Sequence, residues 1–519
     1  MLPAAWVCGT MLARLAGTIE LFPDSSSRFH SRAMAGLLAQ ASAVLAASTV
    51  MPVAGLKGLA VWFGIPALAL IWGPVRRQLG ECLPPQPKHL FGILLACAAC
   101  ASGPVFMHDT GMYHYQAIRW LASEGTLPGI AMLHHRLGFS SSWLAASAVF
   151  DFGPWEASSA TVLNGLLFAL MTGHWIAIAG KADRRREDLL LLAGYPVIIL
   201  LAVFQRMHVS PSPNLPVGVG ILLSGWCLEK GARGSALMLA ASAFAVKANA
   251  APALAIAAVA YWGDVRTRAR VYVTGALLAL PLIAANLISS GCPMYPSSLF
   301  CLETPSSVGD AAASRVTEET LQWARYGGPY PAGVEYWSLR WLPGWLQQPL
   351  NALLVMLVAG CLLALRRTGV GWAAALGLTG TAYVLAAAPD FRFVIGYAAI
   401  LSGCLAMGFP RMVDWTRKVS RNCWVVLAIA LVLINGAAHE ALHAWYIPGG
   451  RVEVGITRLL KPVKLPAPET RVEQRGEVPI RVPVEHQCWA AELGCTPYPP
   501  AASIRFCDAA RGWRGGLCR

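Results

Sequence analysis

The sequence predicts an all-α polytopic membrane protein with about thirteen transmembrane helices. Hydrophobic residues make up 56% of its 519 positions and charged residues only 13%, whereas soluble domains carry about 25% charged residues. The mean hydropathy is +0.52, and many apolar runs approach the length that crosses a bilayer as a helix. The net charge of +14 does not indicate a nucleic-acid-binding protein, because the Lys and Arg fall in short loops rather than in one patch. Membrane lipids are the expected partners of these cations.

The predicted helices follow the apolar runs in order. Residues 1–22 are interrupted by Arg14 and Glu20, so we interpret them as an interfacial or initiating segment and not as a cleavable signal peptide. The short runs 234–248 and 250–263 could form one tilted helix or a broken pair. The thirteen spans are placed near 35–53, 57–74, 89–107, 157–179, 188–205, 214–229, 234–248, 250–263, 270–290, 349–366, 370–388, 393–410 and 423–441.

Loop charge predicts how the chain is oriented. The basic residues follow every second span and therefore fall on one side of the membrane. They are Arg76, Arg77, Lys88, Lys181, Arg184, Arg185, Arg186, Lys230, Arg233, Arg266, Arg268, Arg270, Arg366, Arg367, Arg411, Arg417, Lys418 and Arg421. By the positive-inside rule this side is the cytoplasm. The expected location is a bacterial inner (cytoplasmic) membrane, with the N-terminus in the cytoplasm and the C-terminus outside.

Three large segments are then expected on the outer side. Residues 1–441 would form the bundle with outer loops 108–156 and 291–348, and residues 442–519 a small Cys- and Pro-rich outer segment. A surface helix is expected at about 310–326. The outer segments hold even numbers of cysteines, which favours disulfides: Cys292 and Cys301 in the loop, and Cys488, Cys495, Cys507 and Cys518 in the tail. The tail allows three pairings, which the sequence does not distinguish. Zinc binding by the tail is a weaker alternative, since no CxxC pair exists.

Asp109 is the candidate catalytic residue. It follows a predicted span directly, where a carboxylate can take a proton from a hydroxyl and activate it as a nucleophile. The alternative is an N-cap, because Asp109 precedes a helical pattern and Asp is a favoured cap. The two roles do not exclude each other.

Polar and aromatic side chains surround Asp109 in the first outer loop. Such groups suit a phosphate or sugar hydroxyls, although interfacial His and Arg also bind lipid headgroups. The candidates for substrate binding are His108, Tyr113, His114, Gln116, His134, His135 and Arg136. Their spacings match neither an HExxH motif nor a zinc ribbon, so no metal ligands are predicted.

Cations at other outer boundaries are candidates for binding a phosphate. Lys247 lies at the outer end of an apolar run, where the alternative is snorkelling to the surface. Arg206 and His208 lie in a short outer loop, and Arg392 lies in a PDFRF motif where a local ion pair with Asp390 is the simpler interpretation. Tyr295, between two prolines, suggests an ordered loop over the site.

Four blocks in the chain carry a family resemblance: DTGMYHYQAIRW, PGIAMLHHRLGFSSSW, SGCPMYPSS and PDFRF, within residues 105–393. Together they resemble a less characterised bacterial group of multi-pass proteins near the GT-C class of integral-membrane glycosyltransferases. The acid in a long first outer loop, the amphipathic helices of that loop and the outer C-terminal segment are similar to GT-C architecture.

This resemblance implies a polyprenyl-phosphate sugar donor, transfer on the outer leaflet and inversion at the anomeric carbon. Asp109 would match the catalytic base, and Lys247, Arg206 or Arg392 would offset charge on the departing phosphate. Some members carry two adjacent acids here, whereas this chain has His108 beside Asp109. A second acid would have to be supplied by Glu124, Asp151 or Glu156. No cofactor besides the lipid-linked donor is expected. A divalent metal is compatible but not indicated, because a lone carboxylate binds hard cations poorly.

The expected function is transfer of a sugar from a polyprenyl-phosphate donor to a cell-envelope glycan, lipid or protein. A glycan polymerase or ligase is the nearest alternative. A transporter or flippase of lipid-linked sugars is the alternative from another class, and a non-catalytic assembly subunit is a third. Ion-coupled transport usually places acids inside the spans, and the sequence places none deep within them.

Overall fold

The protein is mostly helical in its computed structural model, which describes residues 1–16, 25–78, 87–105, 107–204, 206–262, 265–329, 331, 338–368, 371–409, 411–420, 422–432, 434, 463–500 and 503–519. The α-helices are α1 (Leu2–Leu15), α2 (Ser25–Ser48), α3 (Gly55–Ile71), α4 (Gly73–Arg76), α5 (Pro87–Ala101), α6 (Tyr115–Ser123), α7 (Ser142–Ala148), α8 (Val162–Ala179), α9 (Asp188–Phe204), α10 (Asn214–Glu229), α11 (Arg233–Val246), α12 (Ala251–Ala260), α13 (Val265–Ser290), α14 (Asp310–Tyr326), α15 (Leu342–Leu346), α16 (Pro349–Thr368), α17 (Trp372–Ala387), α18 (Phe391–Met407) and α19 (Arg411–Lys418).

Short helices of other types and four strands complete the described fold. The short helices are the π-helix η3 (Thr110–His114) and the 3-10 helices η4 (Ile130–Met132), η5 (His135–Gly138), η6 (Gly153–Trp155), η7 (Ala248–Ala250), η8 (Leu339–Trp341) and η9 (Ala509–Gly515). The strands are β1 (Thr470–Arg475), β2 (Val478–Pro483), β3 (Arg505–Phe506) and β4 (Leu517–Cys518), paired antiparallel as β1–β2 and β3–β4. The prediction of an all-α chain is therefore wrong for the tail, where short strands do not show the long apolar periodicity that dominates the rest.

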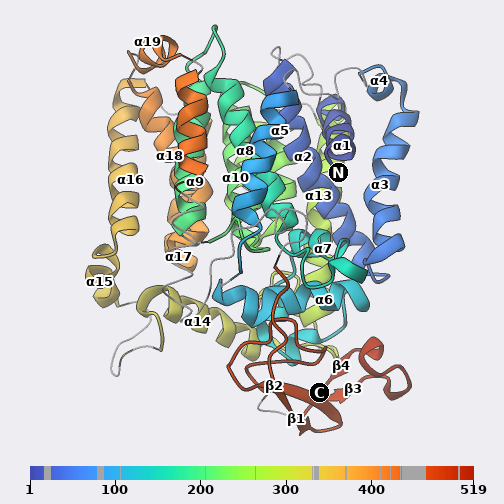
Figure 1. Cartoon of the computed structure of the whole chain (residues 1–519). Helices are drawn as coiled ribbons and strands as arrows, with labels where there is room; N and C mark the ends of the chain where they lie inside the picture. Colours follow the sequence, from blue (N-terminus) through green and yellow to red (C-terminus); the bar gives the residue numbers. More distant parts are fainter. Residues whose placement is uncertain are drawn as a thin grey trace.

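The bundle places apolar helices side by side, with α9 against α18, α11 against α13 and α5 against α8 (Figure 1). The apolar runs of the sequence form helices close to the predicted positions. Large apolar side chains on the outside of the bundle remain exposed, among them Leu56, Ile71, Phe91, Leu277 and Leu363. Exposed apolar side chains of this kind suit contact with lipid tails.

The prediction of thirteen spans is not supported. Among the described residues, three helical stretches are long and apolar enough to cross a membrane: Val162–Ala179, Ala269–Ser290 and Pro349–Arg366. Most of the other apolar helices have 10–17 residues, shorter than the roughly 20 that a bilayer requires. The sequence overestimates the spans because several of the apolar runs form helices too short to cross a bilayer. The runs 234–248 and 250–263, for example, form a broken pair of short helices, α11 and α12, which Lys247 separates with extended backbone angles. Part of the predicted span 423–441 lies outside the described residues.

The two ends of the bundle differ. Figure 1 shows α4 and α19 at one end, and α6, α14 and the strands beyond the other. Basic loops meet at the first end, where the Arg417 guanidinium donates to the Arg184 carbonyl at 2.5 Å and the Arg186 Nε donates to the Met407 carbonyl at 3.1 Å. Segments 108–156, 291–348 and the tail contact one another at the second end. The Tyr295 hydroxyl donates to the His135 carbonyl at 2.9 Å, and the Arg519 amide donates to the Pro305 carbonyl at 3.1 Å.

The tail and the first outer loop share one hydrophobic core. Trp120, Leu127 and Leu133 pack in it with Ile480 and Leu517. The described part of the tail is therefore held against the loop that contains Asp109.

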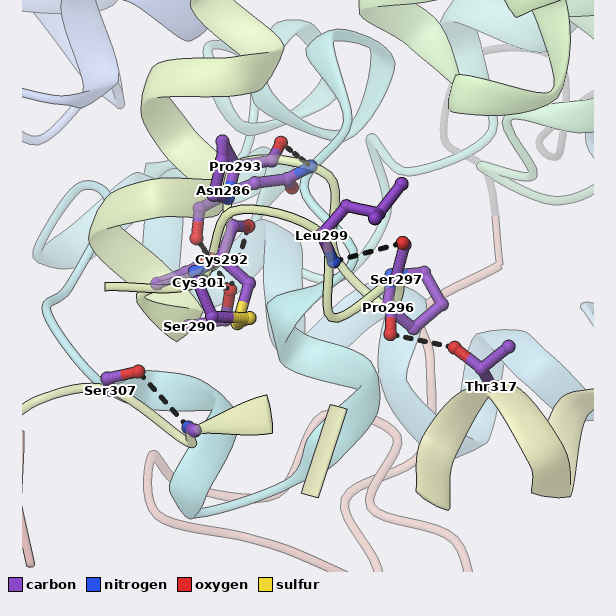
Figure 2. The surroundings of a disulfide bond; sticks show 12 residues. Asn286, Ser290, Cys292, Pro293, Pro296, Ser297, Leu299, Cys301, Ser307 and Thr317 are labelled. Carbon is purple, nitrogen blue, oxygen red and sulfur yellow. Dashed lines mark hydrogen bonds between the residues drawn. A yellow bond between two sulfur atoms is a disulfide. The ribbon is translucent and has the colours of Figure 1, made fainter. Parts of the chain in front are cut away.

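The disulfides expected in the outer segments are present and join neighbouring cysteines: Cys292–Cys301, Cys488–Cys495 and Cys507–Cys518. This settles the tail pairing that the sequence left open. Figure 2 shows how the loop closed by the first disulfide lies against α14, the predicted surface helix: the Thr317 hydroxyl donates to the Pro296 carbonyl at 2.7 Å.

Candidate functional site

Asp109 lies at the start of the outer loop, where η3 leads into α6. Its backbone is helical, but its side chain makes no capping hydrogen bond, so the N-cap interpretation does not describe this carboxylate. Oδ2 of Asp109 is 3.1 Å from Nη1 of Arg392, and Oδ1 is 3.6 Å from Nη1 of Arg136. The two arginines come from α18 and η5, so three distant segments meet at one carboxylate.

Arg392 is shared between two acids. Its Nε and Nη2 donate to Oδ2 of Asp390 at 2.9 and 2.7 Å, while Asp390 Oδ1 accepts from the Arg392 amide and caps α18. The local ion pair expected between Asp390 and Arg392 is thus observed, and Arg392 pairs with Asp109 as well. Sequence reasoning missed Asp390 as the second acid near Asp109, because 281 positions separate the two (390 minus 109).

Asp109 is ionised at neutral pH. Burial alone would raise the pKa of this carboxyl, but the nearby cations, Arg392 first among them and then Arg136 and Lys247, hold its pKa below the usual value. A carboxylate held in this way accepts a proton poorly until a cation moves away.

Lys247 stands near this cluster at the end of α11. Its ammonium donates to Oδ1 of Asn214 at 2.6 Å and lies 4.0 Å from the centre of the Phe393 ring. Phe393 follows Arg392 directly. Lys247 therefore lies in the same part of the structure as Asp109. Its ammonium contacts protein groups there, whereas a snorkelling lysine would only extend its ammonium to the membrane surface.

Three histidines of the first loop are uncharged at neutral pH: His114 and His134, which are buried, and His135, which is half-buried. Burial is the main reason why the pKa of His114 and that of His135 fall to about 4 and that of His134 falls well below its usual value. His134 Nδ1 accepts a hydrogen bond from the Arg136 amide at 3.0 Å. The rings of His134 and His135 both pack against Tyr498 of the tail. They are positioned to hold the loop and the tail together rather than to offer positive charge.

Tyr113 and Tyr295 both pack against Phe139 in the first outer loop. The Arg136 guanidinium lies 5.7 Å from the centre of the Tyr113 ring, which also contacts His114 and Phe139. Tyr295 is 3% exposed and packs on Phe139. Tyr295 is therefore part of the packed interior between the two outer loops.

The tail contacts the chain on both sides of Asp109. The Trp489 amide donates to the Gly111 carbonyl at 2.8 Å, and the Gln487 amide group donates to the His108 carbonyl at 3.3 Å. Gln116, predicted to bind substrate, donates to the carbonyls of Trp489 and Ala491. No local signal could have revealed these contacts, because their partners lie more than 370 positions apart.

Arg206 and His208 lie in the loop after α9. The His208 ring is fully buried, contacts the Ala202 carbonyl at 3.3 Å and packs on Phe168. Arg206 has a positive φ of 56°. These His208 contacts are with α8 and α9, and the role of Arg206 and His208 in binding a phosphate stays a prediction.

The other acids considered as partners of Asp109 have structural roles. Asp151 is buried and accepts hydrogen bonds from the Tyr115 hydroxyl, the Ala157 amide and the Ser159 hydroxyl. The Glu124 carboxylate lies 2.7 Å from Arg514, and that of Glu156 lies 3.5 Å from Arg119. In the described part of the chain, no group of three or more His, Cys, Asp or Glu side chains could hold a metal ion.

A cavity of about 700 Å³ opens beside Arg392, between α14, α15 and the start of α18. Its lining includes Trp323, Arg325, Tyr326, Arg340, Trp341, Trp345, Gln348, Asp390 and Arg392. Its size is that of a small-molecule site, and arginines and aromatic rings are suited to phosphates and to the faces of sugars. Sequence reasoning missed this cavity, although the clustered aromatic residues in QWARY and RWLPGWL were a signal.

A family model described as a domain of unknown function (DUF8201) matches residues 1–399. The chain belongs to the DUF8201 family. The DUF8201 match includes Asp109, Arg136, Lys247, Asp390 and Arg392, and it ends before the tail that contacts the Asp109 loop. No curated protein and no solved structure matches the chain.

His114 is expected to make stability depend on pH. The folded pKa of about 4 lies below the usual 6.5, so the unfolded chain binds more protons and stability falls as the pH drops from about 6.5 to 4. For this one side chain the full loss is about 3 kcal/mol at pH 4. Unfolding of the detergent-solubilised protein should therefore depend less steeply on pH in His114→Asn. The exposed His486→Asn is the control, and equal slopes in all three proteins would contradict the prediction.

Proposed function

We propose that the protein is a membrane glycosyltransferase of GT-C type, transferring a sugar from a polyprenyl-phosphate donor to a cell-envelope glycan, lipid or protein. The observation that carries the proposal is the position of Asp109. Its carboxylate is bonded to Arg392, which in turn lines a cavity of about 700 Å³ rich in arginine and tryptophan. The resemblance of the blocks around Asp109 and Arg392 to the GT-C class supports the same reaction.

The chemistry assigned to Asp109 is that of a general base. As the acceptor hydroxyl attacks the anomeric carbon, its proton passes to a carboxylate oxygen of Asp109. The bond between the anomeric carbon and the phosphate oxygen breaks on the opposite side, so the configuration inverts. The electron pair leaves with the polyprenyl phosphate, whose charge Arg392 and Lys247 offset. A cofactor is not part of this scheme.

We also propose that the shorter helices lie in the bilayer beside the three long ones, in a bacterial inner membrane. Disulfides at the end that carries the site favour an oxidising compartment there. The basic loops gathered at the other end favour the cytoplasm. The site would then face outwards.

The test is donor turnover by the protein in right-side-out membrane vesicles. Polyprenyl-phosphate sugars are added from outside, and release of polyprenyl phosphate is measured with wild type and with Asp109→Asn. Release that depends on Asp109 supports the transferase. Translocation of the donor without release, equal in both proteins, would overturn it in favour of a transporter. Consumption of diphosphate-linked oligosaccharides alone would overturn it in favour of a polymerase or ligase.

A further inference from the structure

We propose that the cavity between α14, α15 and the start of α18 binds a lipid-borne phosphate, and that this phosphate competes with Asp109 for Arg392. The polyprenyl identity of the lipid rests on the proposed function. The cavity, its charge and the shared arginine do not depend on it.

The charge of the cavity favours an anion. Its lining includes three arginines, Arg325, Arg340 and Arg392, and one acid, Asp390. Asp390 is already neutralised by two hydrogen bonds from the Arg392 guanidinium. The remaining field is positive, and guanidinium groups bind phosphate through paired N–H donors.

Aromatic packing holds this wall in place. The Arg325 guanidinium lies 5.3 Å from the centre of the Trp341 ring. Trp341 packs edge-on against Trp345, whose indole N–H donates to the Pro389 carbonyl at 2.6 Å. This hydrogen bond holds the segment that leads to Arg392 against α15. The cavity is therefore formed before a ligand binds.

The position of the cavity favours a phosphate that is attached to a lipid. Pro349 and Leu350 line it and begin α16, which is long and apolar enough to cross a membrane. Further along α16, Val355 and Met356 are exposed on the bundle surface. An acyl or prenyl chain could lie along this helix while its phosphate occupies the cavity.

Arg392 connects the cavity to Asp109. Nη1 of Arg392 is 3.1 Å from the Asp109 carboxylate, and Arg392 is also one of the residues that line the cavity. A phosphate that engages Arg392 weakens its bond to Asp109, and by linkage Asp109 weakens phosphate binding to the same extent. Departure of this cation would free the carboxylate to accept a proton. The donor itself would then activate the base.

The experiment measures equilibrium binding of radiolabelled polyprenyl phosphate to the full-length protein in nanodiscs, without acceptor. Arg325→Gln and Arg340→Gln should each lower affinity about tenfold, the worth of a charge-assisted hydrogen bond. Arg315→Gln, an exposed arginine of α14 outside the cavity, should stay within about twofold. Asp109→Asn should raise affinity about three- to tenfold, because it removes the negative charge that competes with the phosphate for Arg392.

Competition by polyprenol and by inorganic phosphate identifies which part of the ligand the cavity binds. Polyprenyl phosphate binding that polyprenol does not compete for, and that inorganic phosphate displaces only at much higher concentration, supports a lipid-borne phosphate. Equal competition by polyprenol would overturn the proposal, since the arginines would then contribute nothing. Equal displacement by inorganic phosphate, mole for mole, would overturn the lipid assignment.

The variants separate this inference from the proposed function. Unchanged affinity in both cavity-arginine variants, with transfer intact, would overturn the binding site and leave the transferase standing. Tighter binding by Asp109→Asn with undiminished transfer would support the competition and overturn the role of Asp109 as base. Arg340 is exposed, so its variant keeps the test valid if Arg325→Gln fails to fold.

Discussion

Replacing Asp109 by asparagine is expected to lower the rate of sugar transfer by about 100- to 10,000-fold, the usual contribution of a general base. Asparagine has nearly the same shape and can still accept a hydrogen bond from Arg392. It cannot take the proton of an acceptor hydroxyl. The loss should therefore appear in the rate at saturating donor, and the measurement is the turnover of polyprenyl-phosphate sugar by purified protein.

The matched control is Glu156→Gln, which removes an exposed acid from the same loop. Glu156 pairs with Arg119 at 3.5 Å, and exposed pairs of this kind contribute about 1 kcal/mol or less. Its turnover should match that of wild type. Equal turnover in Asp109→Asn and Glu156→Gln would show that Asp109 is an ion-pair partner only. A transporter or an assembly subunit would then be the favoured function.

The sequence predicted where helices would lie, because apolar runs and their boundaries are local properties. It could not predict how many helices cross a membrane. The runs on either side of Lys247 illustrate why: the sequence left open whether they form one tilted helix or a broken pair, and the extended backbone at Lys247 divides them into helices of 14 and 10 residues. Hydropathy alone does not distinguish these two arrangements.

The candidate site shows the same limit at longer range. Asp109 and Arg392 were each recognisable, because a charged side chain beside an apolar run needs a partner. Their pairing with each other was not recognisable, since nothing in either motif specifies a partner 283 positions away. The cavity beside them was also missed. Its tryptophans and arginines are ordinary for a membrane interface, and only the fold shows that they enclose a space.

The tail was expected to carry disulfides, but its contact with the Asp109 loop was not predicted. Cys488 lies between Gln487 and Trp489, the two residues that bond to either side of Asp109. The fit there is close: a Cβ added to Gly111 would lie 2.4 Å from the Trp489 ring. The Cys488–Cys495 disulfide is therefore placed to hold the segment that contacts this loop.

Replacing both Cys488 and Cys495 by serine is expected to loosen that contact. Opening a loop of this size removes about 2–3 kcal/mol, so amide exchange in peptides covering 108–116 and 486–491 should accelerate about 30- to 100-fold. The Trp489 amide, which donates to Gly111, is the most direct probe. Hydrogen exchange followed by mass spectrometry measures both peptides in one experiment.

The control is the neighbouring pair, Cys507→Ser with Cys518→Ser. This disulfide joins β3 to β4 and lies beside Leu517, whose amide donates to the Pro128 carbonyl rather than to the Asp109 segment. Exchange in 108–116 and 486–491 should stay within about threefold of wild type. Equal acceleration by both pairs would mean that the disulfides stabilise the tail only as a whole. Acceleration by the first pair alone would show that Cys488 and Cys495 hold the contact beside Asp109, and transfer by that variant should then fall without any change in the Asp109 side chain.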